Sequence, residues 1–173
     1  TDGHGVYMGV RGVGAPFTGE ARVGKRELGL ELNGRGHGMG ADDVGEISRV
    51  APKILEGRCP PVLKDFIEVR GLGLLNVRTI FGETAVRPKM RLKLIVHLEK
   101  PTPGGAEVER LPLAEQSEDV LGITVRKVVV PVAAGRNLAV LLEAAVRNYI
   151  LHLRGIDSTA EFEIGRAWGR ERG

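Results

Sequence analysis

The segment from Gly19 to Lys25 has the residue types and the spacing of a phosphate-binding loop. It reads Gly19-Glu20-Ala21-Arg22-Val23-Gly24-Lys25, with two glycines five positions apart and a lysine directly after the second. In loops of this spacing, backbone N–H groups surround phosphate oxygens and the lysine reaches the terminal phosphates. An ordinary glycine turn with an exposed lysine is the alternative interpretation.

Two residues of this loop depart from the usual pattern. The position after the lysine normally holds Ser or Thr, whose hydroxyl helps to bind Mg²⁺, and here it is Arg26. A guanidinium has only donors, so it cannot ligate a cation. Arg22 stands where such loops often have glycine, and a left-handed conformation there would cost about 1–3 kcal/mol. The sequence therefore predicts a loop that binds phosphate and is poor at transferring it.

An acidic pair, Asp42 and Asp43, follows 17 and 18 residues after Lys25. That separation allows a helix and a return strand to bring a carboxylate back to the loop, where it could bind Mg²⁺ or accept a proton from an attacking hydroxyl. Adjacent side chains point in different directions, so only one of the two should face the site. A helix cap or a turn is the alternative role for such a pair.

The elements around the loop predict how it is positioned. Residues 14–18 read as a strand that enters the loop, and 27–32 read as a helix that leaves it and stops at Asn33-Gly34. Further expected elements are strands over 5–10, 66–70, 91–99 and 123–132, helices over 74–81 and 137–154, a turn-rich excursion over 51–61 and a surface loop over 101–106. This pattern predicts an α/β fold without internal repeats.

Composition excludes several classes of protein. With 173 residues, 42% hydrophobic and 27% charged, the chain fits one soluble domain. Its longest uncharged apolar run, residues 138–142, is too short for a membrane span, and no segment reads as a signal peptide, so we expect no membrane partner and a cytoplasmic location. Dispersed charges and 4% aromatic residues argue against nucleic acid binding, and the single Cys59 rules out an intramolecular disulfide. The 25 glycines suggest loops that approach a ligand closely.

Several segments together resemble a known family. They are His4-Gly5-Val6, the loop 19–25, Arg35-Gly36-His37, Ala41-Asp42-Asp43, the run 68–77 and the run 131–140. Over about residues 3–162 the chain resembles the carboxy-terminal catalytic domain of bacterial HPr kinase/phosphorylase of the proteobacterial type. The resemblance implies a P-loop-containing kinase domain of α/β class, with a mixed β-sheet flanked by helices, similar to phosphoenolpyruvate carboxykinase. We place this domain at residues 1–162 and a disordered or artefactual tail at 163–173. Because the resemblance covers only the carboxy-terminal domain, we expect the family's amino-terminal domain to be missing from this sequence.

The resemblance also implies an activity. Family members phosphorylate a serine of the phosphocarrier protein HPr with ATP or pyrophosphate and remove that phosphate by phosphorolysis, and so regulate carbohydrate metabolism. The implied cofactor is Mg²⁺, and the implied assembly is a hexamer. The departures at Arg22 and Arg26 leave two alternatives open, a nucleotide or phosphate-binding module without transfer and a regulatory protein that docks HPr.

Each candidate site residue takes its role from a matching family motif. The resemblance implies catalytic roles for His4, Lys25, Asp43 and Arg110, with Asp43 exchanging a proton with the serine. The cofactor-binding residues are Gly19, Glu20, Ala21, Arg22, Val23, Gly24, Lys25 and Arg26. The metal ligand is Glu68, with Asp42 as a second candidate. Two regions implied in the mechanism are Ile67, Glu68, Val69, Arg70, Gly71, Leu72, Gly73, Leu74, Leu75 and Asn76, and Pro131, Val132, Ala133, Ala134, Gly135 and Arg136. Taken singly, these residues would read as surface or loop positions.

Overall fold

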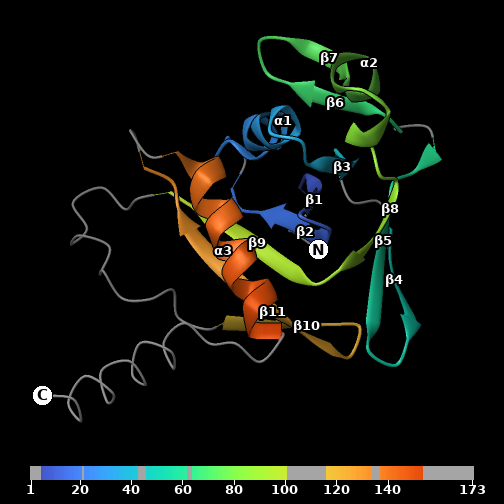
Figure 1. Cartoon of the computed structure of the whole chain (residues 1–173), viewed down its shortest axis with the longest axis vertical. Helices are drawn as coiled ribbons and strands as arrows, with labels where there is room; N and C mark the ends of the chain where they lie inside the picture. The colour runs from blue at the N-terminus through green and yellow to red at the C-terminus, as the bar shows by residue number, and fades with distance from the viewer. Residues whose placement is uncertain are drawn as a thin grey trace, which may run out of the picture.

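A mixed β-sheet organises the computed structural model, which describes residues 5–20, 22–42, 46–61, 64–100, 116–133 and 137–153 (Figure 1). Within these residues the sheet has nine strands, and seven of them follow the order β10-β11-β9-β2-β8-β5-β4, while β1 pairs with β2 and β3. Their bounds are β1 Tyr7–Val10, β2 Val13–Thr18, β3 Gly38–Ala41, β4 Glu46–Ala51, β5 Ile54–Arg58, β8 Lys89–Leu92, β9 Leu94–Glu99, β10 Gln116–Val120 and β11 Ile123–Pro131. The observed architecture confirms the predicted α/β class.

Two long helices and a hairpin complete the described fold. Helix α1 (Lys25–Gly34) and helix α3 (Leu138–Leu153) contact each other, and α1 also packs against β6. The hairpin consists of β6 (Phe66–Val69) and β7 (Gly73–Asn76), and it leads into the short helix α2 (Val77–Phe81) and the 3₁₀ helix η2 (Glu83–Ala85). No helix in these ranges has both the length and the apolar character that spanning a bilayer requires.

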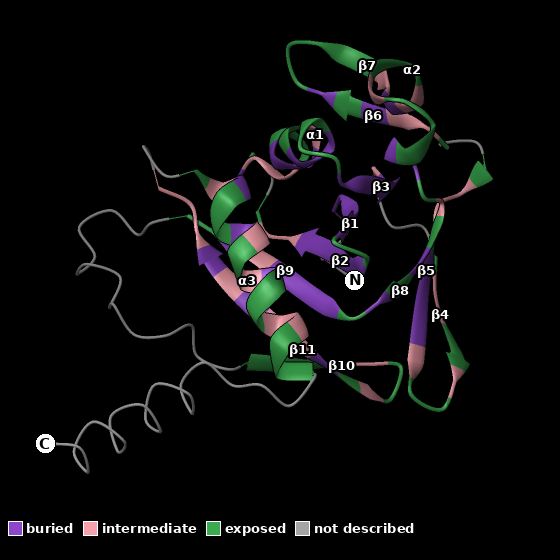
Figure 2. Ribbon diagram, viewed as in Figure 1, coloured by how far each residue is buried: buried purple, intermediate pink, exposed green. Residues whose placement is uncertain are grey.

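The larger hydrophobic cluster lies between the sheet and the helices (Figure 2). Met8, Phe17 and Val96 from the strands meet Leu28 and Leu32 of α1, and all five side chains are nearly or fully buried. Ala139, Leu142 and Val146 of α3 and Ile67 and Val69 of β6 join the same cluster. Burial of apolar surface of this kind is the dominant favourable term in folding, so the core fixes α1 against the strands that position its loop.

One edge of the sheet collects the ends of several strands. Strand β9 runs parallel to β2, and β11 runs parallel to β9. Strands β2 and β3 are both antiparallel to β1, so they share a direction. The carboxyl ends of β2, β3, β9 and β11 therefore lie at the same edge, which we call the loop edge because residue 19 leaves β2 there. This is the edge at which open α/β sheets bind their ligands.

A Schellman motif ends α1 at the opposite edge. The N–H of His37 donates to Leu32 O at 3.0 Å, and the N–H of Gly36 donates to Asn33 O at 3.0 Å. Gly36 has φ of +94°, the left-handed conformation that this motif requires and that glycine adopts without strain. The stop predicted at Asn33-Gly34 is confirmed, because Gly34 is the last residue of α1. Asn33 is a buried helical residue, and its side-chain amide donates to His37 O at 2.8 Å.

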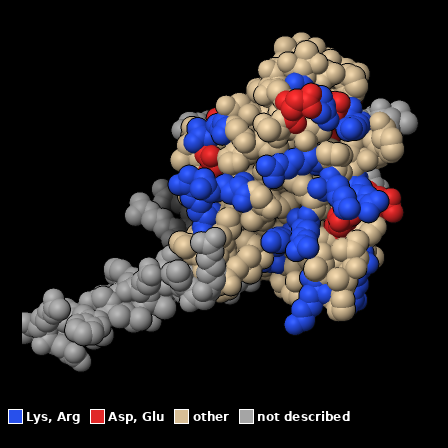
Figure 3. Space-filling model, turned by 45° about the vertical axis from the view of Figure 1, so that its right-hand side comes forward, with Lys and Arg blue, Asp and Glu red and all other residues tan. Residues whose placement is uncertain are grey.

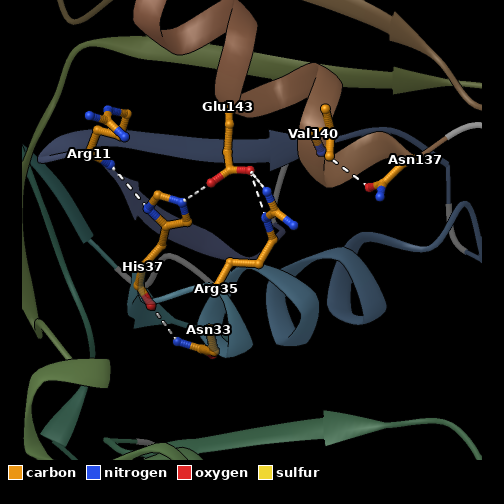
Figure 4. A network of polar contacts seen from close by, with 7 residues as sticks. All are labelled: Arg11, Asn33, Arg35, His37, Asn137, Val140 and Glu143. Atoms are coloured by element: carbon orange, nitrogen blue, oxygen red, sulfur yellow. Dashed lines mark hydrogen bonds and ion pairs between the residues drawn. The ribbon is translucent and has the colours of Figure 1, made fainter.

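An ion-pair network ties the end of α1 to α3 (Figure 4). Glu143 of α3 accepts from Arg35 Nε at 2.6 Å and from His37 Nε2 at 2.7 Å. The backbone N–H of Arg11 donates to Nδ1 of His37 at 3.3 Å, and this places the imidazole proton on Nε2. The hydrogen bonds from His37 and Arg35 lower the pKa of Glu143. The charged carboxylate therefore holds the two helices together.

Glu143→Gln should change how stability depends on pH. A carboxylate with a lowered pKa stabilises the fold above its unfolded pKa of about 4.3, and the contribution is lost as the pH falls through the folded value. We expect the free energy of unfolding of the natural chain to fall more steeply between about pH 5 and pH 3 than that of Glu143→Gln. Urea denaturation at several pH values measures both slopes. Glu31→Gln, an exposed position on α1, is the control, and equal slopes for all three chains would contradict the prediction.

Three strand glycines make room for the buried ring of Tyr7. A Cβ added to Gly57 would lie 2.6 Å from Tyr7 Cε2, one added to Gly40 would lie 2.7 Å from Cδ2, and one added to Gly14 would lie 2.4 Å from the hydroxyl oxygen. The hydroxyl donates to Met90 O at 2.7 Å, and burial raises the pKa of Tyr7 well above its ordinary value. These glycines therefore serve packing, whereas the sequence had suggested loops near a ligand.

Four other local predictions were wrong. The segment expected to be turn-rich contains strand β5, which pairs with β4 and β8. The expected helix over 74–81 is a strand up to Asn76 and a helix only from Val77. The single strand expected over 91–99 is two strands, β8 and β9, interrupted at Lys93. Strand β10 was not predicted, because four of its five residues are exposed and polar. The tail expected at 163–173 and the loop at 101–106 lie outside the described residues.

Candidate functional site

The predicted phosphate-binding loop joins β2 to α1, as its sequence context requires. Gly24 caps the helix in a left-handed conformation with φ of +103°, and its carbonyl accepts from Leu28 N at 3.0 Å. The half-buried Lys25 donates from Nζ to Gly19 O at 2.8 Å, so its ammonium lies against the start of the loop. A helix leaves the N–H groups of its first turn without partners within the helix, and its positive end favours an anion there. The arrangement therefore suits a bound phosphate.

Arg22 adopts the left-handed conformation that the sequence analysis had considered for this position. Its φ is +72°, and its side chain is exposed. An L residue in this region carries strain that glycine avoids, which explains the preference for glycine in such loops. Arg22 therefore introduces backbone strain into the candidate phosphate-binding loop.

Arg22→Gly should stabilise the chain by about 1 kcal/mol, because relief of left-handed strain exceeds the added flexibility of the unfolded chain. The midpoint of thermal unfolding should then rise by roughly 3 °C. Differential scanning calorimetry measures the change. Arg22→Ala retains a Cβ and should give little gain, so an equal gain in both variants would show that the strain has no role.

Asp42 lies at the loop edge and holds two other candidate residues. Its Oδ1 accepts from Arg26 Nε at 2.8 Å, and its Oδ2 accepts from the backbone N–H of Glu68 at 3.1 Å. The Asp42 side chain is 14% exposed and that of Arg26 is 46% exposed. One carboxylate thus joins the first turn of α1 to strand β6. Arg26, which stands in place of the usual Ser or Thr, therefore also neutralises the Asp42 carboxylate.

Among the described residues two carboxylates, those of Glu68 and Asp42, could bind a magnesium ion at this site. No cluster of three or more His, Cys, Asp or Glu side chains with metal-ligand geometry occurs within these ranges. Mg²⁺ in phosphate sites generally needs only one or two protein carboxylates, because phosphate oxygens and water complete its octahedron. The exposed Glu68 can supply one such oxygen, and Asp42 can supply another once Arg26 releases it. The donor set therefore fits the ion in chemistry, and Arg26 opposes it in charge.

The hairpin region implied in the mechanism divides into packing and exposed residues. Ile67 and Val69 are buried in the core, and Asn76 caps α2 by accepting from Thr79 N at 3.0 Å. Glu68 and Arg70 are exposed. Leu72 and Leu74 expose 66% and 65% of their surface. The hairpin lies beside α1, so it presents charged and apolar groups next to the loop edge (Figure 1).

The second implied region begins at the same edge. Pro131 ends β11 opposite Glu99 of β9, and Val132 N donates to Glu99 O at 2.8 Å. Ala133 follows at the end of this described stretch. His4, Ala21, Asp43, Arg110, Ala134, Gly135 and Arg136 lie outside the described residues.

The sequence did not predict the polar pair of Thr18 and His97, which lies directly before the loop. Thr18 Oγ1 lies 2.8 Å from His97 Nδ1, across the parallel pairing of β2 with β9. His97 reads in the sequence as one residue of an alternating strand, and only the strand order places it beside the loop. No spacing within the sequence could reveal this contact.

Comparison with known proteins places these observations in a family. Residues 1–165 match the family described as HPr Serine kinase C-terminal domain. The chain is 64% identical over 159 residues to an HPr kinase/phosphorylase from Aromatoleum aromaticum and 64% identical over 160 residues to one from Nitrosomonas europaea, with 92% of this chain covered in each comparison. It spans about half the length of these curated relatives, 51% and 50%.

A solved structure shares the fold. The HPr(Ser) kinase/phosphatase from Coxiella burnetii superposes with a TM-score of 0.81 and is 36% identical in sequence. The match covers 92% of this chain and 96% of that one. Fold and sequence therefore point to the same family.

Proposed function

Because the chain belongs to the HPr serine kinase C-terminal domain family, we propose that it transfers phosphoryl groups to and from a serine of the phosphocarrier protein HPr. The donor would be ATP or pyrophosphate, and the reverse reaction would be phosphorolysis by inorganic phosphate. The relatives are named for this activity. It remains a proposal for this chain because the chain covers only about half of their length.

The loop geometry is the observation that carries this proposal. The Lys25 ammonium donates a hydrogen bond to Gly19 O at the start of the loop. Asp42 accepts a hydrogen bond from Arg26, which lies in the first turn of the following helix. A positive group beside a phosphate and a carboxylate at the same edge are two of the recurring parts of sites that transfer a phosphoryl group to a hydroxyl. The exposed apolar hairpin tip next to them suits a protein surface as the acceptor.

The proposed forward step has a simple balance of bonds and protons. The serine oxygen attacks the terminal phosphorus, the bond from that phosphorus to the leaving phosphate oxygen breaks, and Asp43 accepts the serine proton. In the reverse step an oxygen of inorganic phosphate attacks the phosphoserine phosphorus, and Asp43 returns the proton to the departing serine oxygen. The products of the reverse step are serine and pyrophosphate. Lys25 would balance charge on the transferred group in both directions.

Mg²⁺ would neutralise phosphate charge and align the donor when bound, with Glu68 as its protein ligand and Asp42 as the second. Arg26 would hold Asp42 back from this role. Catalytic roles for His4 and Arg110, a hexameric assembly and a cytoplasmic location complete the proposal by the same family resemblance.

An assay with both substrates tests the proposed function. The chain is mixed with HPr, ATP and Mg²⁺, and separately with phosphoserine-HPr and inorganic phosphate, and phosphoserine is followed by mass spectrometry. We expect formation in the first mixture and loss in the second, with pyrophosphate as the second product. Absence of both reactions, with ATP bound in calorimetry, would show a binding module instead. Absence of both with no ATP bound but HPr retained would show a docking protein.

A further inference from the structure

A hollow of about 710 Å³ lies at the edge of the sheet opposite to the loop edge. Its lining includes Arg11, Arg35, His37, Arg147, Ile150 and Leu151. Arg11 lies in the turn between β1 and β2, and Arg35 follows the last residue of α1. The second half of α3 contributes Arg147, Ile150 and Leu151. Three separate elements thus build this hollow at the far end of α1 from the loop.

The hollow is basic. Arg11, Arg35 and Arg147 are all exposed, and within the described ranges neither the Arg11 guanidinium nor that of Arg147 has an acidic partner. Glu143 is the acidic group beside them, and it pairs with Arg35 and accepts from His37. The three guanidiniums and the one carboxylate together carry a formal charge of +2. The chain as a whole carries +3, and Lys and Arg also outnumber acidic residues on the face in Figure 3.

Two backbone carbonyls at this end of α1 already have hydrogen-bond partners. The carbonyls of Leu32 and Asn33 accept hydrogen bonds from the N–H groups of His37 and Gly36. Among the described residues no hydrogen bond or ion pair engages the guanidinium of Arg11 or of Arg147, so both are available to solvent or to a ligand. Each guanidinium offers a planar fork of donors that matches two oxygens of a phosphate or a carboxylate.

We propose that this hollow binds a small organic anion with at least two negative charges, carried on phosphate or carboxylate oxygens. Arg11 and Arg147 hold the oxygens, and Arg35 contributes the donors that Glu143 leaves free. Ile150 and Leu151 provide an apolar wall for the carbon part of the ligand. The volume lies within the range of small-molecule sites, about 300–1,000 Å³. This site is separate from the phosphate-binding loop.

Isothermal titration calorimetry of the whole chain at low ionic strength tests the site. Glycerol 3-phosphate and citrate are the probes, and they represent the phosphate and the carboxylate source. For at least one probe, we expect the dissociation constant to rise about tenfold in Arg11→Ala and in Arg147→Ala, because each removes a charge-assisted hydrogen bond to the anion. Arg147→Lys should bind more tightly than Arg147→Ala. Thermal unfolding of each variant establishes that it is folded.

Two control variants separate this site from other sources of binding. Lys25→Ala disables the phosphate-binding loop, and Arg91→Ala removes the same charge from an exposed position on β8. Both should bind the probe as tightly as the natural chain. Loss of binding in Lys25→Ala would place the anion in the loop, and equal weakening in Arg91→Ala would show a general charge effect. Either result, or no binding of either probe to the natural chain, would overturn the proposal.

Discussion

Lys25→Met is expected to reduce phosphoryl transfer by about 10²- to 10³-fold in both directions, the usual effect of removing one preorganised charge from a transition state. The ammonium lies 2.8 Å from Gly19 O, within the loop that would hold the phosphates. Methionine has a similar length and no charge, so the variant should keep its fold. Initial rates of HPr phosphorylation and of phosphoserine-HPr phosphorolysis measure the effect.

Lys53→Met is the matched control for this variant. Lys53 is exposed in the turn between β4 and β5, and its loss should leave both rates unchanged. If Lys25→Met retained full activity in both directions, the loop could not be the phosphate site. The proposed mechanism would then be wrong, although the fold and the family assignment would stand.

Arg26→Ser is expected to raise the rate of transfer by about a hundredfold, which corresponds to about 2.7 kcal/mol of the activation barrier. Two effects combine. Serine supplies the hydroxyl that normally helps to hold Mg²⁺, and the change frees Asp42 Oδ1 from the 2.8 Å contact with Arg26 Nε. The expected gain should depend on Mg²⁺ concentration, because it acts through the metal. Rates at several Mg²⁺ concentrations test this directly.

Arg91→Ser provides the control for a lost surface arginine, and it should leave the rate unchanged. The exposed pair between Arg26 and Asp42 contributes at most about 1 kcal/mol to folding, so altered stability should not obscure the kinetic result. Equal activity in Arg26→Ser and the natural chain would contradict the metal-ligand argument. A natural chain that binds ATP without transfer, with activity only in Arg26→Ser, would identify it as a binding module.

The sequence predicted the central unit of the fold because its signals are local. A strand, a glycine loop and a helix follow one another within 22 residues from Val13 to Gly34, and each has its own composition signal. Helix α3 was predicted over 137–154 for the same reason, and it spans Leu138–Leu153. The structure adds that the Asn137 side chain caps this helix by accepting from Val140 N at 3.2 Å. Strand β11 was also found, within one residue at its carboxyl end.

Errors arose where tertiary pairing overrides local composition. Strand β3 is Gly-Met-Gly-Ala, which no propensity scale favours as a strand, yet all four residues are buried against β1. Residues 91–99 read as one strand in the sequence. Only the sheet shows that the chain changes partner at Lys93: β8 before it pairs with β5, and β9 after it pairs with β11. A single sequence does not contain this partner change.

The candidate site was predicted in part. The loop and Asp42 could be identified from spacing, and the contact between Asp42 and the backbone of Glu68 agrees with the proximity that the family resemblance implied. The contact between Asp42 and Arg26 could not be predicted, because it depends on how the end of β3 approaches the first turn of α1. The roles assigned to Lys25, Asp43 and Glu68 remain predictions for the assays above.

The close packing of Gly14, Gly40 and Gly57 around the Tyr7 ring limits how this chain can evolve. The three atoms nearest to a methyl group at position 57 would all belong to the Tyr7 ring, so Gly57→Ala should become acceptable once Tyr7 is replaced by a smaller residue. A methyl group at position 14 would also lie 2.1 Å from Arg91 O, which no change at Tyr7 can relieve. Epistasis therefore links positions 7 and 57 and fixes the order in which they can mutate, whereas Gly14 is constrained in every background.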